Sequence, residues 1–520
     1  MYPKDIIRGG TIMDFGIFSL VPPLLAILLA FVTKNVLLSL FCACFVGATM
    51  IAGNPLVGFV DVFGNYMIPK IADSWNAGVI AMTLFVGCFS VMLERGGGAY
   101  AFGQAVKNKI KTRRQGQISA WLGGLMIWFS DSSNSVIIGP ILRSVTDRLK
   151  VSREKLAYIC DSTASSVPLL LPITGWGAMV IGIYREFLPE DTNMVEVFIK
   201  SVPFNLYTIT IIVMVLVIGI TGWDFGPMRK AEVRAVKEGK LVSDNATIKD
   251  DFVFTLPEGA KPTAWGLIIP LIVLIGSLFA TLIYTGPRGE GIMQAIIGGD
   301  TMLSLTVAFF LASLVGVIMA MHAKVVSFKE GYEIFTDGFK RMIEAILILI
   351  FAWCIGGVTS DVGASTFIVE LTSGFMTPGI MFISLFVIAC FTSFATGTSW
   401  GTFAIFLTIA VPLAEAAGIP VFPAIGASLA GGLFGDHCSP ISDSTILASI
   451  GASCDHLDHV KTQLPYALLA AAASVVGYVI AAITMNGFIA LAVTLVCMIV
   501  FLFIMQKLDK SERVTDIKPE

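Results

Sequence analysis

The sequence predicts an all-α integral membrane protein, built as an inverted-topology repeat with two re-entrant hairpins and two interrupted helices. Three observations predict this fold class. Hydrophobic residues make up 56% of the 520 positions and charged residues only 14%, against roughly 25% charged residues in soluble domains. The apolar residues recur in blocks long enough for a helix to cross about 30 Å of hydrocarbon. The order of these blocks, and of the basic residues around them, repeats along the chain.

Charge and cysteine content argue against several classes of protein. The net charge of −3 and the lack of a basic stripe with interleaved aromatic residues argue against a nucleic-acid partner. The nine cysteines lie mostly inside apolar blocks, without the spacing of a metal site or a disulfide framework. We interpret them as packing residues and expect no cofactor. Lys4 and Arg8 precede the first apolar run, but no convincing cleavage site follows, so we expect no cleaved signal peptide.

Nine apolar blocks predict single membrane spans, and four longer ones are interrupted by Gly and Pro. The predicted spans are residues 16–33, 36–52, 77–94, 197–222, 263–284, 301–321, 342–358, 464–484 and 486–506. The interrupted stretches are residues 115–147, 155–184, 376–416 and 420–454. One long polar segment, residues 223–262, separates two halves of the chain, and its basic residues predict a solvated cytoplasmic linker.

The stretch 115–147 is predicted to be a hairpin that enters the membrane and returns to the same side. Basic residues flank it on both sides, at 107–114 and at 143–155, which is typical of cytoplasmic ends. One crossing cannot begin and end on the same side. The 28 residues 115–142 are too few for two crossings, which need about 20 residues each. The tip would lie near residues 129–135.

The stretch 376–416 is predicted to be a second hairpin that enters from the opposite side. No Lys or Arg occurs between Arg341 and Lys461, although eight acidic residues fall in that window. Loops in this region should therefore face outward. The tip would lie near residues 395–402.

Each half of the chain repeats one order of elements. Two spans are followed by a surface stretch, a third span, another surface stretch, a hairpin, an interrupted helix and a closing span. The surface stretches are residues 55–72 and 97–112 in the first half and 328–340 and 361–374 in the second. Because the sidedness reverses between the halves, the pattern indicates an inverted-topology repeat.

This repeat sets the predicted domain boundaries. Residues 1–222 form the first inverted repeat and residues 263–484 the second. Residues 485–520 add a further span and a tail whose basic residues place the C-terminus in the cytoplasm. The same assignment places the N-terminus outside.

Each interrupted helix places an aspartate beside hydroxyl residues and a proline. Asp161 lies in the run 160–168, and Asp436 in the run 435–445. A carboxylate in the middle of the membrane costs on the order of 2.5–3.5 kcal/mol, so it is retained only beside a partner or a water-filled cavity. Proline also frees a backbone carbonyl oxygen one turn earlier. Both aspartates are therefore candidate functional residues.

The donor set favours a hard cation. Carboxylate, hydroxyl, amide and carbonyl oxygens suit Na⁺, whereas the absence of clustered Cys and His argues against zinc or copper. Helix N-termini at the hairpin tips can instead hold an anionic group, so both kinds of ligand stay open. The candidate ion- or substrate-binding residues are Asp131, Ser133, Asn134, Ser135, Asp161, Ser162, Thr163, Thr398, Ser399, Asp436, Ser439 and Asp443.

Within this set we assign roles to fewer residues. Na⁺ is assigned to Asp161, Asn134, Asp436 and Thr398, and proton coupling to Asp436, Asp161 and His437. A single Ser or Thr in a membrane helix more often bonds to its own helix or to a neighbouring one. His437 is equally consistent with a hydrogen-bonding support. His456 and His459 are expected at the cytoplasmic headgroups.

Three motifs resemble those of the NhaC family of Na⁺/H⁺ antiporters, within the larger ion-transporter superfamily. They are Gly-Asp-His-Cys-Ser-Pro-Ile-Ser-Asp-Ser at 435–444, Gly-Thr-Ser-Trp-Gly-Thr at 397–402 and Asp-Phe-Gly-Pro-Met-Arg at 224–229. The resemblance covers nearly the whole chain. It implies a scaffold domain, expected to form a homodimer, and a transport domain that carries the hairpins across the membrane as an elevator. It also implies a multi-pass protein of the cell inner (plasma) membrane.

Two functional hypotheses follow. The leading one is sodium-coupled secondary active transport by Na⁺/H⁺ antiport, in which Na⁺ and H⁺ compete for buried aspartates. The alternative is Na⁺-coupled transport of a small organic solute, either an amino acid or a carboxylate, although the motifs contain no Arg or Lys to hold a carboxylate.

Two other classes fit the sequence less well. An intramembrane aspartyl protease would carry Gly-x-Gly-Asp, but Leu433, Phe434 and Gly435 precede Asp436, and we predict no enzyme. Opposed hairpins suit alternating access better than a passive channel.

Overall fold

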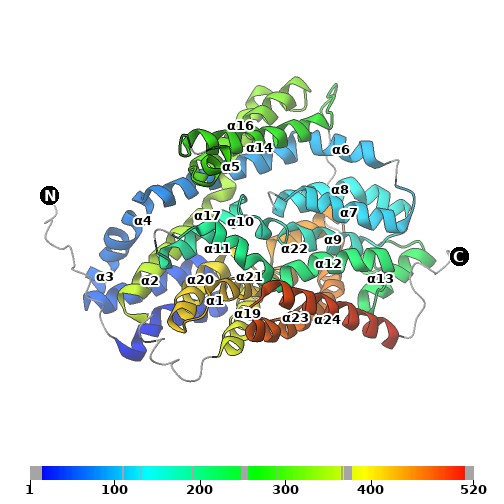
Figure 1. The fold of residues 1–520 in the computed structure, drawn as a ribbon. Helices are drawn as coiled ribbons and strands as arrows, with labels where there is room; N and C mark the ends of the chain where they lie inside the picture. Colours follow the sequence, from blue (N-terminus) through cyan, green and yellow to red (C-terminus); the bar gives the residue numbers. More distant parts are fainter. Residues whose placement is uncertain are drawn as a thin grey trace.

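The computed structural model describes residues 15–107, 110–128, 131–189, 192–246, 256–289, 291–364, 367 and 377–509. Within these ranges every regular element is a helix (Figure 1). Nine of the described helices are long and apolar enough to cross a membrane, or up to eleven if each of two bent pairs counts as one span. The chain is therefore a multi-pass membrane protein.

The first half contains the predicted elements in the predicted order. Its helices are α1 (Val21–Thr33), α2 (Val36–Ala52), α3 (Pro55–Asp61), α4 (Ile68–Ala72), α5 (Ser74–Arg95), α6 (Gly98–Lys107), α7 (Arg113–Met126), α8 (Asp131–Arg148), α9 (Arg153–Ala164), α10 (Gly175–Tyr184), α11 (Met194–Ser201) and α12 (Leu206–Thr221). Short 3₁₀ or π segments join several of them. The chain turns by 120° between α2 and the α3–α4 stretch, where Gly53, Asn54 and Pro55 stop the helix.

The second half of the chain follows the linker helix α13 (Gly226–Lys237). Its helices are α14 (Trp265–Thr285), α15 (Ile292–Ile297), α16 (Thr301–His322), α17 (Phe328–Asp361), α19 (Pro378–Thr396), α20 (Ser399–Ala416), α21 (Val421–Cys438), α22 (Asp443–Ala452), α23 (His456–Thr484) and α24 (Gly487–Leu508). Most of the predicted surface stretch 361–374 lies outside the described residues.

The helices form two layers, which Figure 1 shows one above the other. Helices α5, α14 and α16 pack together in the upper layer, and α17 joins them to the lower one. The lower layer holds both hairpins, both interrupted helices and the closing helices α12, α23 and α24. The hairpins and the interrupted helices therefore lie in the lower layer.

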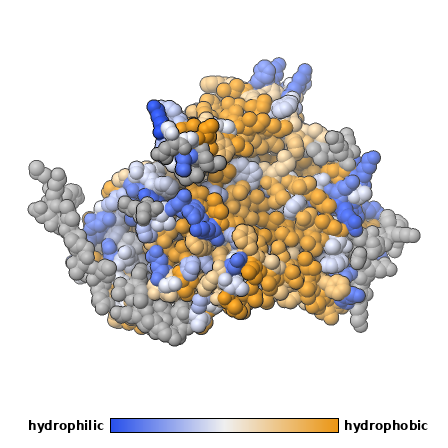
Figure 2. All heavy atoms as spheres, viewed as in Figure 1, coloured by the Kyte–Doolittle hydropathy of each residue, from blue (hydrophilic) through white to orange (hydrophobic). Residues whose placement is uncertain are grey.

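The surface of the protein suits lipid. Figure 2 shows a broad hydrophobic area across the middle of one face, with hydrophilic residues gathered mainly toward its two sides. Large exposed apolar side chains include Ile272 on α14 and Phe488 and Val496 on α24. Contiguous exposed apolar surface of this extent is unusual for a soluble monomer and normal for a membrane protein.

Helices α7 and α8 form a helical hairpin. The Arg113 guanidinium, at the start of α7, donates to the carbonyl oxygen of Lys150, just beyond the end of α8. Arg148 Nη2 donates to Ile110 O at 2.9 Å. Because these contacts join the outer ends of the two helices, the chain enters and leaves this unit at the same end, as predicted for residues 115–147. Helices α19 and α20 follow each other across Gly397 and Thr398, and each is long enough to span.

Two predicted boundaries were wrong. The span 197–222 is divided between α11 and α12, because Pro203 lacks the amide proton that a continuous helix needs at residues 202–205. The surface stretch 328–340 and the span 342–358 form one 34-residue helix, α17. The corresponding elements of the first half, α4 and α5, are separate helices because Asp73 caps the start of α5. In α17, Lys340 and Arg341 favour a continuous helix and offer no such cap.

The prediction that residues 223–262 form a solvated connector was wrong for the first part of this segment, which includes helix α13. Helix α13 packs against the ends of α9 and α23. Glu232 is fully buried and pairs with Arg113, and its Oε1 accepts from Ser152 N at 2.8 Å. Asp224 is buried and pairs with Lys155. The first part of the linker is thus joined to the lower layer through the acidic residues Asp224 and Glu232.

Glycines allow α19 and α21 to approach closely. A Cβ on Gly431 would lie 2.3 Å from Phe386 O, and one on Gly435 would lie 2.3 Å from Phe394 N. These glycines are four residues apart, so they line one face of α21. We expect Gly431→Ala to lower the free energy of unfolding by about 1–3 kcal/mol, because the methyl group must push backbone atoms apart.

Thermal unfolding in detergent measures this effect. The matched control is Gly276→Ala on α14, where a Cβ meets no atom within 4 Å and stability should not fall. Equal destabilisation by both substitutions would contradict the proposed close packing.

Candidate functional site

The first interrupted helix breaks where its sequence requires it. Helix α9 ends at Ala164, a short 3₁₀ turn covers Pro168–Leu170, and α10 begins at Gly175 with a bend of 48°. Thr174 caps α10: its Oγ1 accepts from Gly177 N at 3.0 Å and donates to Pro168 O at 2.8 Å. The predicted interruption of residues 155–184 is confirmed.

The second interrupted helix breaks at the matching motif. Helix α21 ends at Cys438, Pro440 lies in the break, and α22 begins at Asp443. Ser439 Oγ donates to Phe394 O at 2.8 Å, which fastens the break to the end of α19. The predicted interruption of residues 420–454 is confirmed too.

The two motifs meet in the interior of the lower layer. Ser162 Oγ lies 3.0 Å from His437 Nε2, and the two residues directly follow Asp161 and Asp436 in the chain. Gln463 of α23 links the motifs again, because its Nε2 donates to Asp161 Oδ2 at 2.7 Å and also to the carbonyl oxygen of His437. Both aspartates are almost fully buried, with 1% and 3% of their surface exposed.

The Asp436 carboxylate is held by two hydroxyl groups. Ser399 Oγ, at the tip of the second hairpin, donates to its Oδ2 at 2.7 Å. Ser442 Oγ, from the break before α22, donates to its Oδ1 at 2.6 Å. Hydrogen bonds to an ionised acceptor favour the charged form and fix its position.

Helices α8 and α9 pack together, and each carries buried oxygen atoms that lack hydrogen-bond partners among the described residues. These atoms are Asp161 Oδ1 on α9 and Asn134 Oδ1 and Ser135 Oγ on α8. Asn134 Nδ2 donates to Gly124 O at 2.8 Å, which turns its amide group into the interior. A buried hydrogen-bond acceptor without a partner costs free energy of folding unless a cation or a water molecule binds to it.

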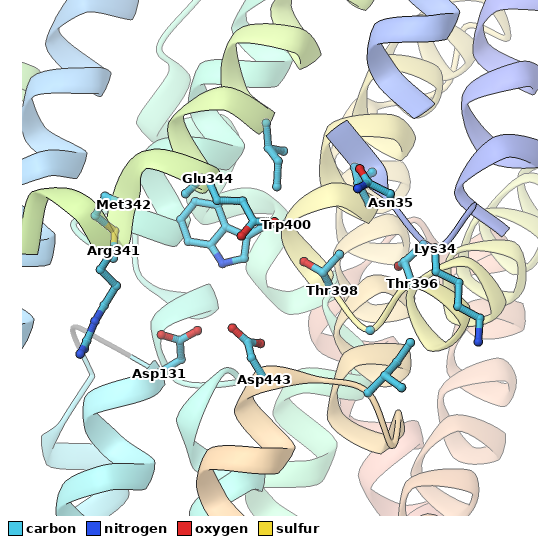
Figure 3. A pocket seen from close by; sticks show the side chains of 15 residues that line it. Lys34, Asn35, Asp131, Arg341, Met342, Glu344, Thr396, Thr398, Trp400 and Asp443 are labelled. Atoms are coloured by element: carbon cyan, nitrogen blue, oxygen red, sulfur yellow. The ribbon is translucent and has the colours of Figure 1, made fainter. Parts of the chain in front are cut away.

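Asp131 and Asp443 lie elsewhere, at the first turns of α8 and α22. Both line a cavity of about 350 Å³ together with Thr398, and Figure 3 shows the carboxyl groups of Asp131 and Asp443 directed into this space. Thr398 and Asp443 face the cavity, whereas Ser399 and Ser442, their chain neighbours, bond to Asp436. The predicted residues thus form two adjoining groups instead of one.

Three charged residues of the cavity were missed in the sequence. Arg341 and Glu344 come from α17, and Lys34 from the corner between α1 and α2. Arg341 Nη1 and Nη2 contact both carboxylate oxygens of Glu94, at 2.5 and 3.0 Å. The sequence contained one indication of this cavity. Arg341 is the last basic residue before the long window without Lys or Arg, and Glu344 follows it on the same face of the helix. Gln463 was missed because it lies just before the predicted span 464–484.

Several candidate hydroxyl groups also serve the helix packing. Thr163 Oγ1 donates to its own helix, at Ile159 O and Cys160 O. The side chain of Ser133 lies outside the described residues. Both ring nitrogens of His437 are occupied, since Nδ1 lies 2.8 Å from Tyr207 OH and Nε2 faces Ser162. This arrangement holds the imidazole ring in place.

The expectation that His459 lies at the headgroups was wrong. Helix α23 begins eight residues before the predicted span 464–484, so its first turns reach the site. His459 is fully buried, with Nε2 2.9 Å from Gln463 Oε1 and 3.9 Å from Asp161 Oδ2. Ser449 Oγ lies 2.9 Å from His459 Nδ1 and 3.1 Å from His456 Nδ1. His459 therefore belongs to the surroundings of Asp161.

A buried polar centre between two broken membrane helices, beside a charged cavity, defines a secondary transporter rather than an enzyme. The sequence pattern of the Na⁺/H⁺ antiporter family matches residues 167–483, and the chain belongs to this family. An uncharacterized protein of Haemophilus influenzae is 33% identical over 95% of this chain and 97% of its own length.

Two further comparisons add detail. The malate-2H⁺/Na⁺-lactate antiporter of Bacillus subtilis is 34% identical over a shorter segment, 34% of this chain and 38% of that protein. The solved structure of Neisseria gonorrhoeae MtrF, an antimetabolite efflux pump, aligns over 94% of this chain and 97% of its own at a TM-score of 0.54. With 14% sequence identity, that likeness concerns the fold alone. The protein is thus a secondary transporter that carries out Na⁺/H⁺ exchange or a related antiport.

Proposed function

We propose that the protein is a sodium-coupled antiporter in which Na⁺ and H⁺ compete at the buried aspartates Asp161 and Asp436. The observation that carries the proposal is that Asp161 Oδ1 and Asn134 Oδ1, on the packed helices α9 and α8, are buried without a hydrogen-bond partner. Na⁺ is a hard cation that prefers oxygen ligands. It would supply the missing partner of Asp161 Oδ1 and Asn134 Oδ1. When Na⁺ leaves, a proton on the carboxylate lowers the cost of keeping it buried.

An elevator movement of the lower layer would give both sides of the membrane access to this site. The cavity supports it, because α17 and the α1–α2 corner form one wall and the hairpin tips form the other. In this scheme the two hairpins are re-entrant and of opposite sidedness, and the protein forms a homodimer in the inner membrane with its C-terminus in the cytoplasm. Na⁺ would bind at Asp161, Asn134 and Asp436, whereas Thr398, the fourth residue assigned to it, lines the adjoining cavity.

A small organic solute is a second candidate for exchange with Na⁺. The cavity of about 350 Å³ favours it, since a volume in this range suits a small ligand and far exceeds that of an ion. The related antiporter of Bacillus subtilis, whose name includes both sodium and organic acids, supports the same view.

Replacing Asp161 by Asn tests the proposed sodium site. We expect NaCl, compared with KCl, to raise the unfolding midpoint of the purified wild-type protein, because a ligand that binds only the folded state stabilises it. Asp161→Asn removes the buried negative charge and should reduce the apparent Na⁺ affinity at least tenfold. Sodium stabilisation equal to that of the wild type would exclude Asp161 as a ligand.

A further inference from the structure

Gln463 lies where three helices meet around the first buried aspartate. It belongs to the first turns of α23, which packs against both α9 and α21. Its side chain is fully buried. The amide nitrogen Nε2 donates to Asp161 Oδ2 at 2.7 Å and also to the carbonyl oxygen of His437, so both of its N–H groups are used. One side chain therefore joins the aspartate of the first interrupted helix to the end of α21.

The neighbours of Gln463 allow only one orientation of its amide group. Asp161 Oδ2 and the carbonyl oxygen of His437 both accept hydrogen bonds, so Nε2 has to face them and Oε1 has to face His459. Because a carbonyl oxygen only accepts, His459 Nε2, at 2.9 Å from Oε1, has to carry a proton. The other ring nitrogen of His459, Nδ1, lies 2.9 Å from Ser449 Oγ. The imidazole ring is thus held at both nitrogen atoms, and it fixes the amide group of Gln463.

This arrangement gives the two carboxylate oxygen atoms of Asp161 different roles. Oδ2 accepts from Gln463, whereas Oδ1 is buried without a hydrogen-bond partner among the described residues. A hydrogen bond from a fixed donor to one oxygen atom holds the plane of the carboxylate and keeps the other oxygen atom in place. A cation that binds Oδ1 then meets a preorganised ligand, and no hydrogen bond within the protein has to break.

We propose that Gln463 is a positioning residue of the sodium site and that His459 holds its amide group in the required orientation. Gln463 keeps Asp161 Oδ1 available to the cation and ties Asp161 to His437, which directly follows Asp436 in the chain. The inference rests on the proposed binding of Na⁺ at Asp161. Neither Gln463 nor His459 is assigned a contact with the cation, so their loss should weaken Na⁺ binding while the ligand itself stays.

The test compares the Na⁺ affinity of Gln463→Leu with that of the wild type. The unfolding midpoint of the purified full-length protein is followed as NaCl replaces KCl, and the NaCl concentration of half-maximal stabilisation gives the affinity. Leu is similar in size to Gln but donates no hydrogen bond. We expect the apparent Na⁺ affinity to fall by about tenfold or more, the effect of losing one hydrogen bond to a charged group.

Transport kinetics separate positioning from a purely structural role. In proteoliposomes, Gln463→Leu should raise the KM for Na⁺ by the same factor and change the maximal rate of Na⁺-dependent proton flux by less than about threefold. A structural defect would lower the unfolding midpoint in KCl and the amount of active protein, but it would leave the KM for Na⁺ unchanged. An unchanged KM for Na⁺ therefore overturns the proposal.

Two variants of His459 test how the amide group is held. His459→Leu removes the donor to Gln463 Oε1 and should lower the Na⁺ affinity severalfold. His459→Gln should retain most of the affinity, because an amide group at this position still donates. Wild-type affinity of His459→Leu overturns the assignment of His459.

The matched control is Gln117→Leu, the same chemical change at a buried glutamine of α7 that lies beside Gly219 of α12. Its Na⁺ affinity should equal that of the wild type, and a loss as large as that of Gln463→Leu overturns the specific role of Gln463. A wild-type protein that Na⁺ does not stabilise contradicts the sodium site itself. Failure of the proposed function is thereby distinguished from failure of the positioning role, in which the wild type responds to Na⁺ and Gln463→Leu responds equally.

Discussion

Asp436→Asn should abolish Na⁺-dependent proton flux, with a rate at least 100-fold below that of the wild type. Asn has the shape of Asp but neither its negative charge nor a carboxylate that can bind a proton. The amide would also place a donor against Ser399 or Ser442, whose hydroxyl groups donate to the carboxylate at 2.7 and 2.6 Å. A pH-sensitive dye inside proteoliposomes records the flux after a pulse of external Na⁺.

The control for this experiment is Glu415→Gln, which makes the same chemical change at an exposed position near the end of α20. It should transport at the wild-type rate. The amounts of folded, reconstituted protein are matched by size-exclusion chromatography before the comparison. If Asp436→Asn transports Na⁺ and protons normally, Asp436 has no part in the coupling and the competition model is wrong.

The interrupted helices were predictable because the reason for each break lies within a few residues of sequence. Pro168 and Pro440 cannot continue a helix, and Thr174 caps the helix that follows the first break. The flanking basic residues also predicted that both ends of the first hairpin lie together, as the contacts of Arg113 and Arg148 confirm. Local rules of helix formation and the distribution of charge were sufficient here.

The residues that form the site were harder to predict, because they come together through contacts between distant segments of the chain. Lys34 and Arg341 are about 300 residues apart in the chain, and neither belongs to a recognisable motif. Gln463 connects Asp161 with His437 although it precedes the predicted span. Asp131 and Asp443 begin α8 and α22, whereas Asp161 and Asp436 lie near the ends of α9 and α21. Their separation therefore depends on how four helices pack, which residue type alone does not reveal.

The buried contacts of the linker were also not predictable from the sequence, and one of them gives the second large expected effect, a loss of stability. Lys155 and Asp224 form a buried ion pair, with side chains only 1% and 2% exposed. Tyr466 OH also donates to Asp224 Oδ1 at 2.9 Å, and the Tyr466 ring stacks on Tyr158, with centroids 5.1 Å apart. Asp224→Asn leaves the Lys155 ammonium buried without a counter-charge. We expect the free energy of unfolding to fall by about 3–5 kcal/mol.

Chemical denaturation in detergent measures this loss. Lys240 and Asp244 form an exposed ion pair of the same residue types, in which hydrogen bonding to Lys240 lowers the pKa of Asp244. Asp244→Asn should therefore leave stability unchanged, because solvent screens exposed charges. The double variant Lys155→Met, Asp224→Asn should recover part of the loss, since no charge then stays buried alone. If Asp224→Asn and Asp244→Asn have equal effects, the buried pair does not fix the linker helix to the layer that carries the site.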